Sequence, residues 1–308
     1  MSRARRSGGF VLVNALVLVA ALAAVAVLLL ARAESARALR ATGQTATQLT
    51  LYLDAFESLA ITVLEADAAS PGGTDNPGEP WAGAEYNVPL DRGRVAGRIS
   101  DLQGRFNVNW LADPSDTEAR AGFDALALRL GLAPRTAEAL VAFLSPGGPA
   151  DKAAYAALEP PVDPVGGAIL ALDQLRIVPG LRAEDWQRLS AVAAALPGDS
   201  LLNVNTAPPE VLRLFLPGVS PARLDRLVQE RTRQPFLSVE DFITRLTGQT
   251  REEAAAAIDP DRFTVSSTWF EVTIEAALED RGMQRRTVLA RQPLPLGVRV
   301  IYRLDQGY

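Results

Sequence analysis

The longest apolar stretch of the chain lies close to its N-terminus. Between Phe10 and Ala31 the only polar side chain is Asn14. As an α-helix this stretch would be about 33 Å long, which is enough to cross the hydrocarbon core of a bilayer. Residues 10–31 are therefore predicted to form a single membrane-spanning helix.

The residues before this stretch leave more than one interpretation open. Arg3, Arg5 and Arg6 precede a Gly8-Gly9 pair, and Phe10 follows directly. A cleaved secretory signal is disfavoured, because its apolar region is usually about 7–15 residues long. A plain membrane anchor is one remaining interpretation. The other is a prepilin-type leader, residues 1–9, which is cut after the glycine so that the apolar segment stays with the mature protein.

The helical pattern continues beyond the apolar stretch. Residues 32–69 contain no proline, and Gly43 is their only glycine. Apolar residues recur there at spacings of three and four, which is typical of one face of a helix. These positions are Leu49, Leu53, Phe56, Ala60 and Val63. The pattern predicts one helix from Phe10 to Ala69, about 90 Å long; two helices joined near Gly43 are the alternative.

Strand-like alternation of apolar and polar residues occurs in two distant parts of the chain. It is found first at residues 86–90 and 94–101, and again at 270–276, 283–291 and 298–304. Asp91-Arg92-Gly93 and the segment from Glu279 to Gly282 are typical of turns between such strands. We therefore expect one antiparallel sheet, built from residues 32–110 and 262–308.

The intervening residues, 111–261, are rich in alanine and leucine and are predicted to form an inserted all-α domain. Its two ends should lie close together, as insertion between two strands demands. A helix–turn–helix pattern recurs there around Gly131, Gly180 and Gly218. We expect each glycine to end one helix with a positive φ. In the third copy, Ser220 is expected to cap the next helix with Pro221 in its first turn.

The third copy resembles the helix-hairpin-helix module of membrane-anchored competence DNA receptors. Five arginines lie near it, Arg213, Arg223, Arg226, Arg231 and Arg233. Acidic residues are interspersed, and the net charge of the chain is −5, whereas binding to phosphates favours a clear basic patch. A DNA receptor therefore stays the alternative function, and a hairpin that serves only for packing is favoured over it.

Composition excludes several kinds of chemistry. The chain has no cysteine and no histidine. It cannot form disulfides, Cys/His zinc sites, thiolate nucleophiles or a Ser-His-Asp triad. We predict no catalytic residues and no enzymatic activity.

Two further segments are informative together with the leader and the insertion. They are the segment Asp101-Leu102-Gln103-Gly104-Arg105-Phe106-Asn107 and the segment Asn203-Val204-Asn205-Thr206-Ala207. With these features in this order, the whole chain resembles the protein K family of the type II (general) secretion system, the large minor pseudopilins. The resemblance implies an α+β fold, in which a pilin-like long N-terminal helix packs on an antiparallel sheet that carries the inserted helical domain.

The resemblance also implies how the protein is processed and where it acts. It implies cleavage by the prepilin peptidase between Gly9 and Phe10 and N-methylation of Phe10. It implies a single-pass protein of the bacterial inner membrane with its head in the periplasm. There the subunit would assemble with other minor pseudopilins and the major pseudopilin, at the tip of a pseudopilus that helps to export folded cargo proteins across the outer membrane.

Asn14 would be the fifth residue of the mature chain, where most pseudopilins carry glutamate. A neutral residue there fits a tip subunit, which has no subunit above it; a tolerated polar residue at a helix interface is the alternative. No cofactor is predicted with assurance, although the resemblance allows calcium. The candidate ligands are Asp113, Asp116, Asp151, Asp163 and Asp173. Solvated acidic residues near helix starts are the favoured explanation for most of them.

Overall fold

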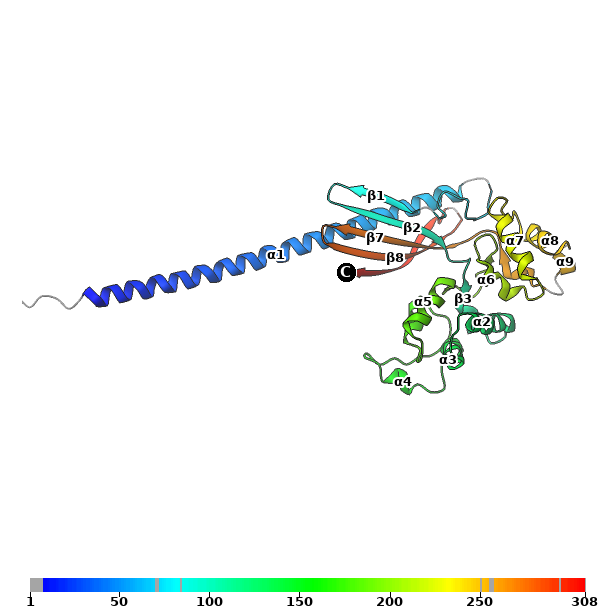
Figure 1. Ribbon diagram of the computed structural model, residues 1–308, viewed down its shortest axis with the longest axis horizontal. Coiled ribbons are helices and arrows are strands. Elements are labelled where there is room, and N and C mark those ends of the chain that lie inside the picture. Colours follow the sequence, from blue (N-terminus) through cyan, green and yellow to red (C-terminus); the bar gives the residue numbers. More distant parts are fainter. Residues whose placement is uncertain are drawn as a thin grey trace, which may run out of the picture.

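The computed structural model describes residues 8–69, 72–83, 85–249, 251–254, 258–293 and 295–307, and for residues 8–11, 38, 41, 252, 253 and 307 only the backbone. The predicted leader, apart from Gly8 and Gly9, lies outside these residues. A long helix projects from a head that contains a sheet and a group of shorter helices (Figure 1). The predicted α+β fold, with a long N-terminal helix and an antiparallel sheet, is confirmed.

The long helix, α1, spans Gly8–Ala68 without a break. It passes through Gly43, so the single-helix prediction is confirmed and the two-helix alternative is wrong. The apolar side chains of its first half are exposed; Leu12, for example, is 72% exposed and Leu22 61%. Among the described residues, α1 is the one helix long and apolar enough to cross a membrane.

The second half of α1 packs on a five-stranded antiparallel sheet with the strand order β1-β2-β7-β8-β9. The strands are β1 (Tyr86–Leu90), β2 (Gly93–Asp101), β7 (Trp269–Leu278), β8 (Arg281–Arg291) and β9 (Val298–Gly307). Leu53, Phe56 and Leu64 of α1 are buried against Phe270, Val272 and other residues on the inner face of the sheet. The predicted apolar face of the helix is therefore the face that forms this core.

The contact between α1 and the sheet also contains buried charges. Glu57 of α1 is 4% exposed and accepts hydrogen bonds from Thr287 Oγ1 at 2.7 Å and from Arg303 Nη2 at 2.6 Å. Arg285 of β8, also 4% exposed, pairs with Asp54 at 2.6 Å and with Asp305 at 2.7 Å. These pairs compensate the charges buried between the helix and the sheet and fix the position of α1 along the strands.

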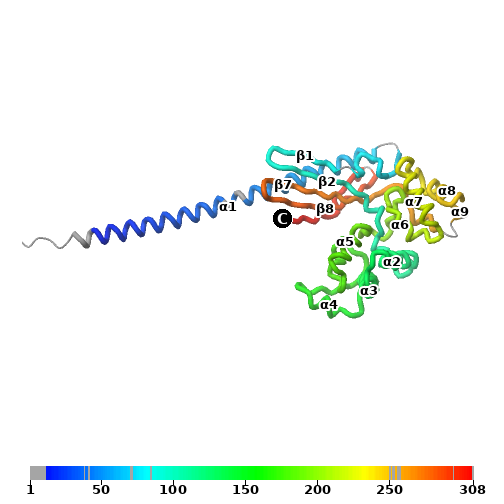
Figure 2. Tube along the Cα trace, in the orientation of Figure 1, coloured from blue at the N-terminus to red at the C-terminus, as the bar shows by residue number. Residues whose placement is uncertain are grey.

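All other elements lie between β2 and β7, in what we call the helical region, residues 106–264. Its first unit contains β3 (Phe106–Asn107), η1 (Val108–Ala112), α2 (Thr117–Arg129), α3 (Pro134–Leu144), α4 (Ala153–Ala156), η2 (Leu172–Ile177), α5 (Ala183–Val192) and β4 (Ala193–Ala194). Its second unit contains β5 (Leu202–Asn203), α6 (Pro209–Leu212), η3 (Arg213–Phe215), α7 (Pro221–Arg231), α8 (Val239–Thr247), α9 (Arg251–Ala254), η4 (Pro260–Arg262) and β6 (Phe263–Thr264). Figure 2 shows the first unit in green and most of the second in yellow.

The sequence predicts an insertion made of α-helices alone, and the structure differs from this prediction. Each unit is closed by a two-residue parallel ribbon, β3 with β4 and β5 with β6. Strands this short carry no detectable alternation, so hydrophobic periodicity could not predict them. The boundaries 111 and 261 of a separate domain stay a prediction.

The three predicted hairpins are present, but their glycines differ. Gly131 and Gly180 have positive φ values of 67° and 83°, whereas Gly218 does not adopt the left-handed conformation. The expected positive φ is therefore wrong for the third copy. There the turn ends as predicted, because Ser220 Oγ accepts a hydrogen bond from the backbone N–H of Arg223 and Pro221 begins α7.

Candidate functional site

The N-terminal residues that the sequence singled out lie at the start of α1. Gly9 and Phe10 belong to the helical backbone of its first turn, and their side chains lie outside the described residues. Asn14 lies one turn further on and is exposed. The structure therefore places the predicted cleavage site directly before the exposed apolar half of α1.

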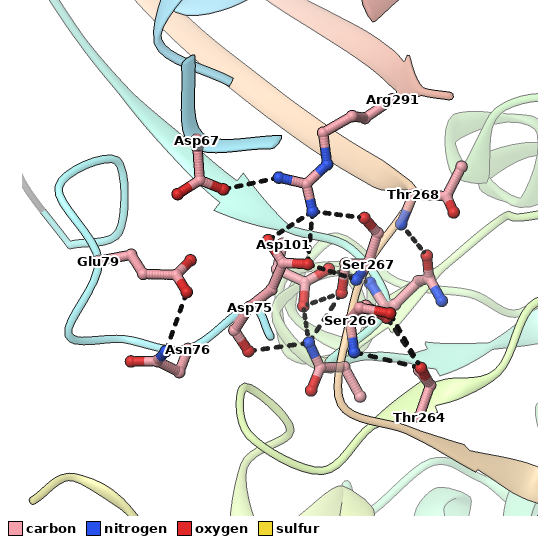
Figure 3. A network of polar contacts seen from close by, with 12 residues as sticks. Asp67, Asp75, Asn76, Glu79, Asp101, Thr264, Ser266, Ser267, Thr268 and Arg291 are labelled. Atoms are coloured by element: carbon pink, nitrogen blue, oxygen red, sulfur yellow. Dashed lines mark hydrogen bonds and ion pairs between the residues drawn. The ribbon is translucent and has the colours of Figure 1, made fainter. Parts of the chain in front are cut away.

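A polar junction connects the sheet to the helical region at the end of β2 (Figure 3). The carboxylate of Asp101 accepts hydrogen bonds from the backbone N–H of Gln103 and the hydroxyl of Ser267, both at 2.7 Å. It also accepts from Thr206 Oγ1 at 2.5 Å and from Asn203 Nδ2 at 3.2 Å. The carboxylate of Asp101 therefore contacts the segment that leaves β2, the start of the second unit and the segment that leads back to β7.

Gln103 and Gly104 complete this junction. Gln103 Oε1 accepts from the backbone N–H of Thr268 at 2.5 Å, and its Nε2 donates to the carbonyl of Leu201 at 2.9 Å. A Cβ atom on Gly104 would lie 2.8 Å from Thr206 Oγ1 and 2.9 Å from the Thr206 carbonyl carbon. Only glycine allows the two segments to approach this closely.

The two Asn-Val-Asn segments have the same role in the two units. Asn107 Oδ1 accepts from the backbone N–H of Asn109, and Asn203 Oδ1 accepts from that of Asn205. The side-chain amide of the second asparagine in each segment forms two hydrogen bonds with the backbone N–H and carbonyl of one other residue. That residue is Ile169 for Asn109 and Phe236 for Asn205. The two units of the helical region therefore share this Asn-Val-Asn arrangement and a closing parallel ribbon, and the repeated segment in the sequence was the signal that could have revealed the likeness.

Acidic groups gather next to the junction, around a cavity of about 820 Å³. Carboxylate oxygens of Asp67, Asp75 and Glu79 lie within 4.8 Å of one another. Arg291 pairs with Asp67 at 2.7 Å and with Asp75 Oδ1 at 2.6 Å. A guanidinium group therefore already supplies the positive charge that a metal ion would bring, and we assign no metal to this cluster.

Burial changes the titration of this region. It raises the pKa of Asp101 to about 6, because burial disfavours the charged form more than the hydrogen bonds from Thr206, Ser267 and Gln103 favour it. Burial also raises the pKa of Glu79 to about 7, and the charges of Asp67 and Asp75 add to the effect. The same cause raises the pKa of Asp75, against the opposing charge of Arg291.

The five calcium candidates are not brought together. Each has a partner within the described residues. Asp113 and Asp151 accept backbone N–H groups two residues further on, and Asp116 caps α2 and pairs with Arg262 at 2.7 Å. Asp163 pairs with Lys152 at 2.7 Å, and Asp173 pairs with Arg286. Capping and ion pairing account for these side chains, so a calcium site at these positions stays an untested prediction.

Most of the arginines near the third hairpin are engaged within the protein. Arg213 pairs with Asp225, Arg223 donates to the carbonyl of Leu246, and the buried Arg231 donates to the carbonyl of Val204. Burial lowers the pKa of Arg231 to about 10. These arginines are engaged in contacts within the protein, whereas a DNA-binding surface would present them to phosphates.

One long helix that projects from an α+β head, with its second half packed on an antiparallel sheet, is the architecture of a pilin-like subunit, and its first half is long and apolar enough to cross a membrane. A solved structure has the same fold: the GspK chain of the GspK-GspI-GspJ complex from the type 2 secretion system of enterotoxigenic Escherichia coli superimposes with a TM-score of 0.72. The match covers 86% of this chain and 98% of that chain, at 22% sequence identity.

Sequence comparisons point to the same family. Two family models described as type II secretion system protein K match residues 104–198 and 202–266. Type II secretion system protein K of Aeromonas hydrophila is 28% identical over 322 residues, which cover 94% of this chain and 95% of that protein. The protein K of Pseudomonas aeruginosa is 29% identical over 305 residues, covering 93% and 90%. The chain belongs to the protein K family of the type II secretion system and is a minor pseudopilin.

Proposed function

We propose that this minor pseudopilin forms the tip of a short periplasmic pseudopilus and helps to export folded proteins across the outer membrane. The subunit would be anchored in the inner membrane by residues 10–31, with its head in the periplasm. Its role would be structural rather than catalytic, and residues 111–261 would act as an inserted domain. The observation that carries the tip position is the side chain of Asn14.

Asn14 lies in the apolar half of α1, where a charged group would be costly in lipid. In most pseudopilins a glutamate at this position offsets the charged amine of a neighbouring subunit. A subunit that begins the filament has no subunit above it and does not need this carboxylate. A neutral Asn14 is therefore compatible with the first position of a filament.

The proposed partners are other minor pseudopilins, and below them the major pseudopilin. The similar structure from Escherichia coli was solved as a complex of GspK with GspI and GspJ. We propose that this chain forms an equivalent complex through its own head and α1. Co-purification of the tagged full chain with candidate minor pseudopilins tests this directly.

The proposal includes processing by the prepilin peptidase. The cut would fall between Gly9 and Phe10, and Phe10 would then be N-methylated. The mass of the protein purified from its host should correspond to a chain that starts at methylated Phe10. A chain with its leader intact, or one cut after Ala33, would contradict the proposal.

A matched pair of variants makes this test specific. Gly9→Val should leave the leader uncut and abolish secretion, because the peptidase requires a small residue directly before the cut. Gly8→Val changes the neighbouring glycine in the same way and should still be cleaved. Equal processing of both variants would show that the cut lies elsewhere.

A further inference from the structure

The helical region contacts the sheet at a second place, which begins beside the junction, since Leu102 directly follows Asp101. This contact lies on the outer face of the sheet, the face opposite α1. Ala194 and Leu196 of the helical region pack there against Leu102 and Val288, and Trp269 and Tyr302 are partly buried beside them. Only two side chains of the helical region contribute to this cluster of described residues, so the apolar contact is small.

An ion pair lies beside this apolar contact. Asp173 of η2 pairs with Arg286 of β8, and the two side chains are 26% and 33% exposed. Arg286 Nη1 also lies 3.8 Å from Glu271 Oε2, and Arg105 Nη2 lies 3.4 Å from Glu271 Oε1. These charges connect the first unit to the middle of the sheet.

The junction at Asp101 differs in character from this second contact. There the outgoing and returning chains meet, and four hydrogen bonds converge on one carboxylate. Covalent continuity at both ends of the helical region holds this point in place. Contacts between two parts of a chain that are small and partly polar commonly allow relative motion.

We infer that the helical region is hinged, with the Asp101 junction as its pivot and the Asp173–Arg286 ion pair as a latch that holds it against the outer face of the sheet. Release of the latch lets Ala194 and Leu196 leave the sheet and uncovers Val288 and Tyr302. The angle between the helical region and α1 therefore has a closed state, described by the structure, and an open state.

Distance measurements between spin labels test this inference in the full chain, reconstituted in lipid nanodiscs. The chain has no cysteine, so only introduced cysteines are labelled. Leu128→Cys on α2, where the leucine is 82% exposed, and Gln284→Cys on the exposed side of β8 report on the two parts. The parent should give mainly one distance.

Asp173→Asn and Arg286→Gln should each raise the population of a second, longer distance by about fivefold, the factor expected for loss of one partly exposed ion pair. The double variant should open no further than either single variant. Leu196→Ala should open the hinge as well, and 1 M salt should shift the parent in the same direction while leaving Asp173→Asn unchanged.

Asp163→Asn is the matched control, because Asp163 pairs with Lys152 inside the helical region, at 2.7 Å. It should leave the parent distance unchanged. Distances like those of the parent in Asp173→Asn, Arg286→Gln and the double variant, and an unchanged parent at 1 M salt, would overturn the inference. So would an equal change in the Asp163→Asn control.

Discussion

Asp101 at the end of β2 and Ser267 before β7 are joined by a hydrogen bond of 2.7 Å, although 166 positions separate them in the chain. The helical region leaves the sheet at one of these residues and returns at the other. The carboxylate of Asp101 also accepts from Thr206 and Asn203 of the second unit. This one group therefore contacts both ends of the helical region and the start of its second unit.

Replacing Asp101 tests the role of this carboxylate. Asp101→Ala should lower the free energy of unfolding by about 2 kcal/mol, because buried donors of Asn203, Thr206 and Ser267 lose their acceptor. Urea denaturation of the full chain in detergent micelles, followed by tryptophan fluorescence, measures the change. Asp163→Ala, which removes an exposed carboxylate, should change the stability by less than about 1 kcal/mol. Equal effects of the two variants would contradict this role.

Gly104 offers a test of the close approach at the junction. Gly104→Ala should destabilise the protein by about 1–3 kcal/mol, because the new methyl group would meet the backbone and hydroxyl of Thr206. Gly198→Ala is the matched control, since no atom lies within 4 Å of the added Cβ. Thermal unfolding of both variants separates a steric effect from the general cost of replacing a glycine, and the account fails if Gly198→Ala is the more harmful.

The acidic groups beside the junction predict a dependence of stability on pH. Burial raises the pKa of Glu79 from 4.5 to about 7, so the folded state binds this proton more tightly than the unfolded state. The resulting stabilisation is complete below about pH 4.5 and is lost as the pH rises to about 7. The pKa of Asp101 is raised from 3.8 to about 6, which adds a smaller loss of stability with rising pH.

Trp81 Nε1 donates a hydrogen bond to Glu79 Oε2 at 2.7 Å. Glu79→Gln should remove part of the pH dependence, because the amide stays neutral and its oxygen can still accept this hydrogen bond. The free energy of unfolding should then fall less between pH 5 and pH 7 than in the parent. The exposed Glu85 provides the control, and Glu85→Gln should keep the slope of the parent. An unchanged slope in Glu79→Gln would show that Glu79 titrates outside this range.

The contact between α1 and the sheet gives a fourth prediction. Glu57→Ala should lower the free energy of unfolding by about 3 kcal/mol, because Arg303 and Thr287 lose the buried carboxylate that they contact. Asp54 lies one turn away on the same helix and is 55% exposed, and its partner Arg285 keeps Asp305 when Asp54 is removed, so Asp54→Ala should cost less than Glu57→Ala. Denaturation curves that place Asp54→Ala at or above the cost of Glu57→Ala would refute this order.

The sequence predicted the parts of the fold that rest on regular patterns. The apolar face from Leu49 to Ala60 predicted which side of α1 packs on the sheet. The alternation in residues 270–276 predicted the buried face of β7. The junction rests instead on contacts such as the one between Asp101 and Thr206, which are 105 positions apart. No local pattern encodes such a contact. The two Asn-Val-Asn segments were visible in the sequence, but their amide pairs with Ile169 and Phe236 depend on tertiary structure.

The proposed position of this subunit is at the start of a filament, not within its shaft. It is tested most directly by locating the subunit on isolated pseudopili, with an epitope tag at the C-terminus and gold-labelled antibody in electron microscopy. A tip subunit should give a single label at one end of each filament. Labels distributed along the filament shaft would contradict it.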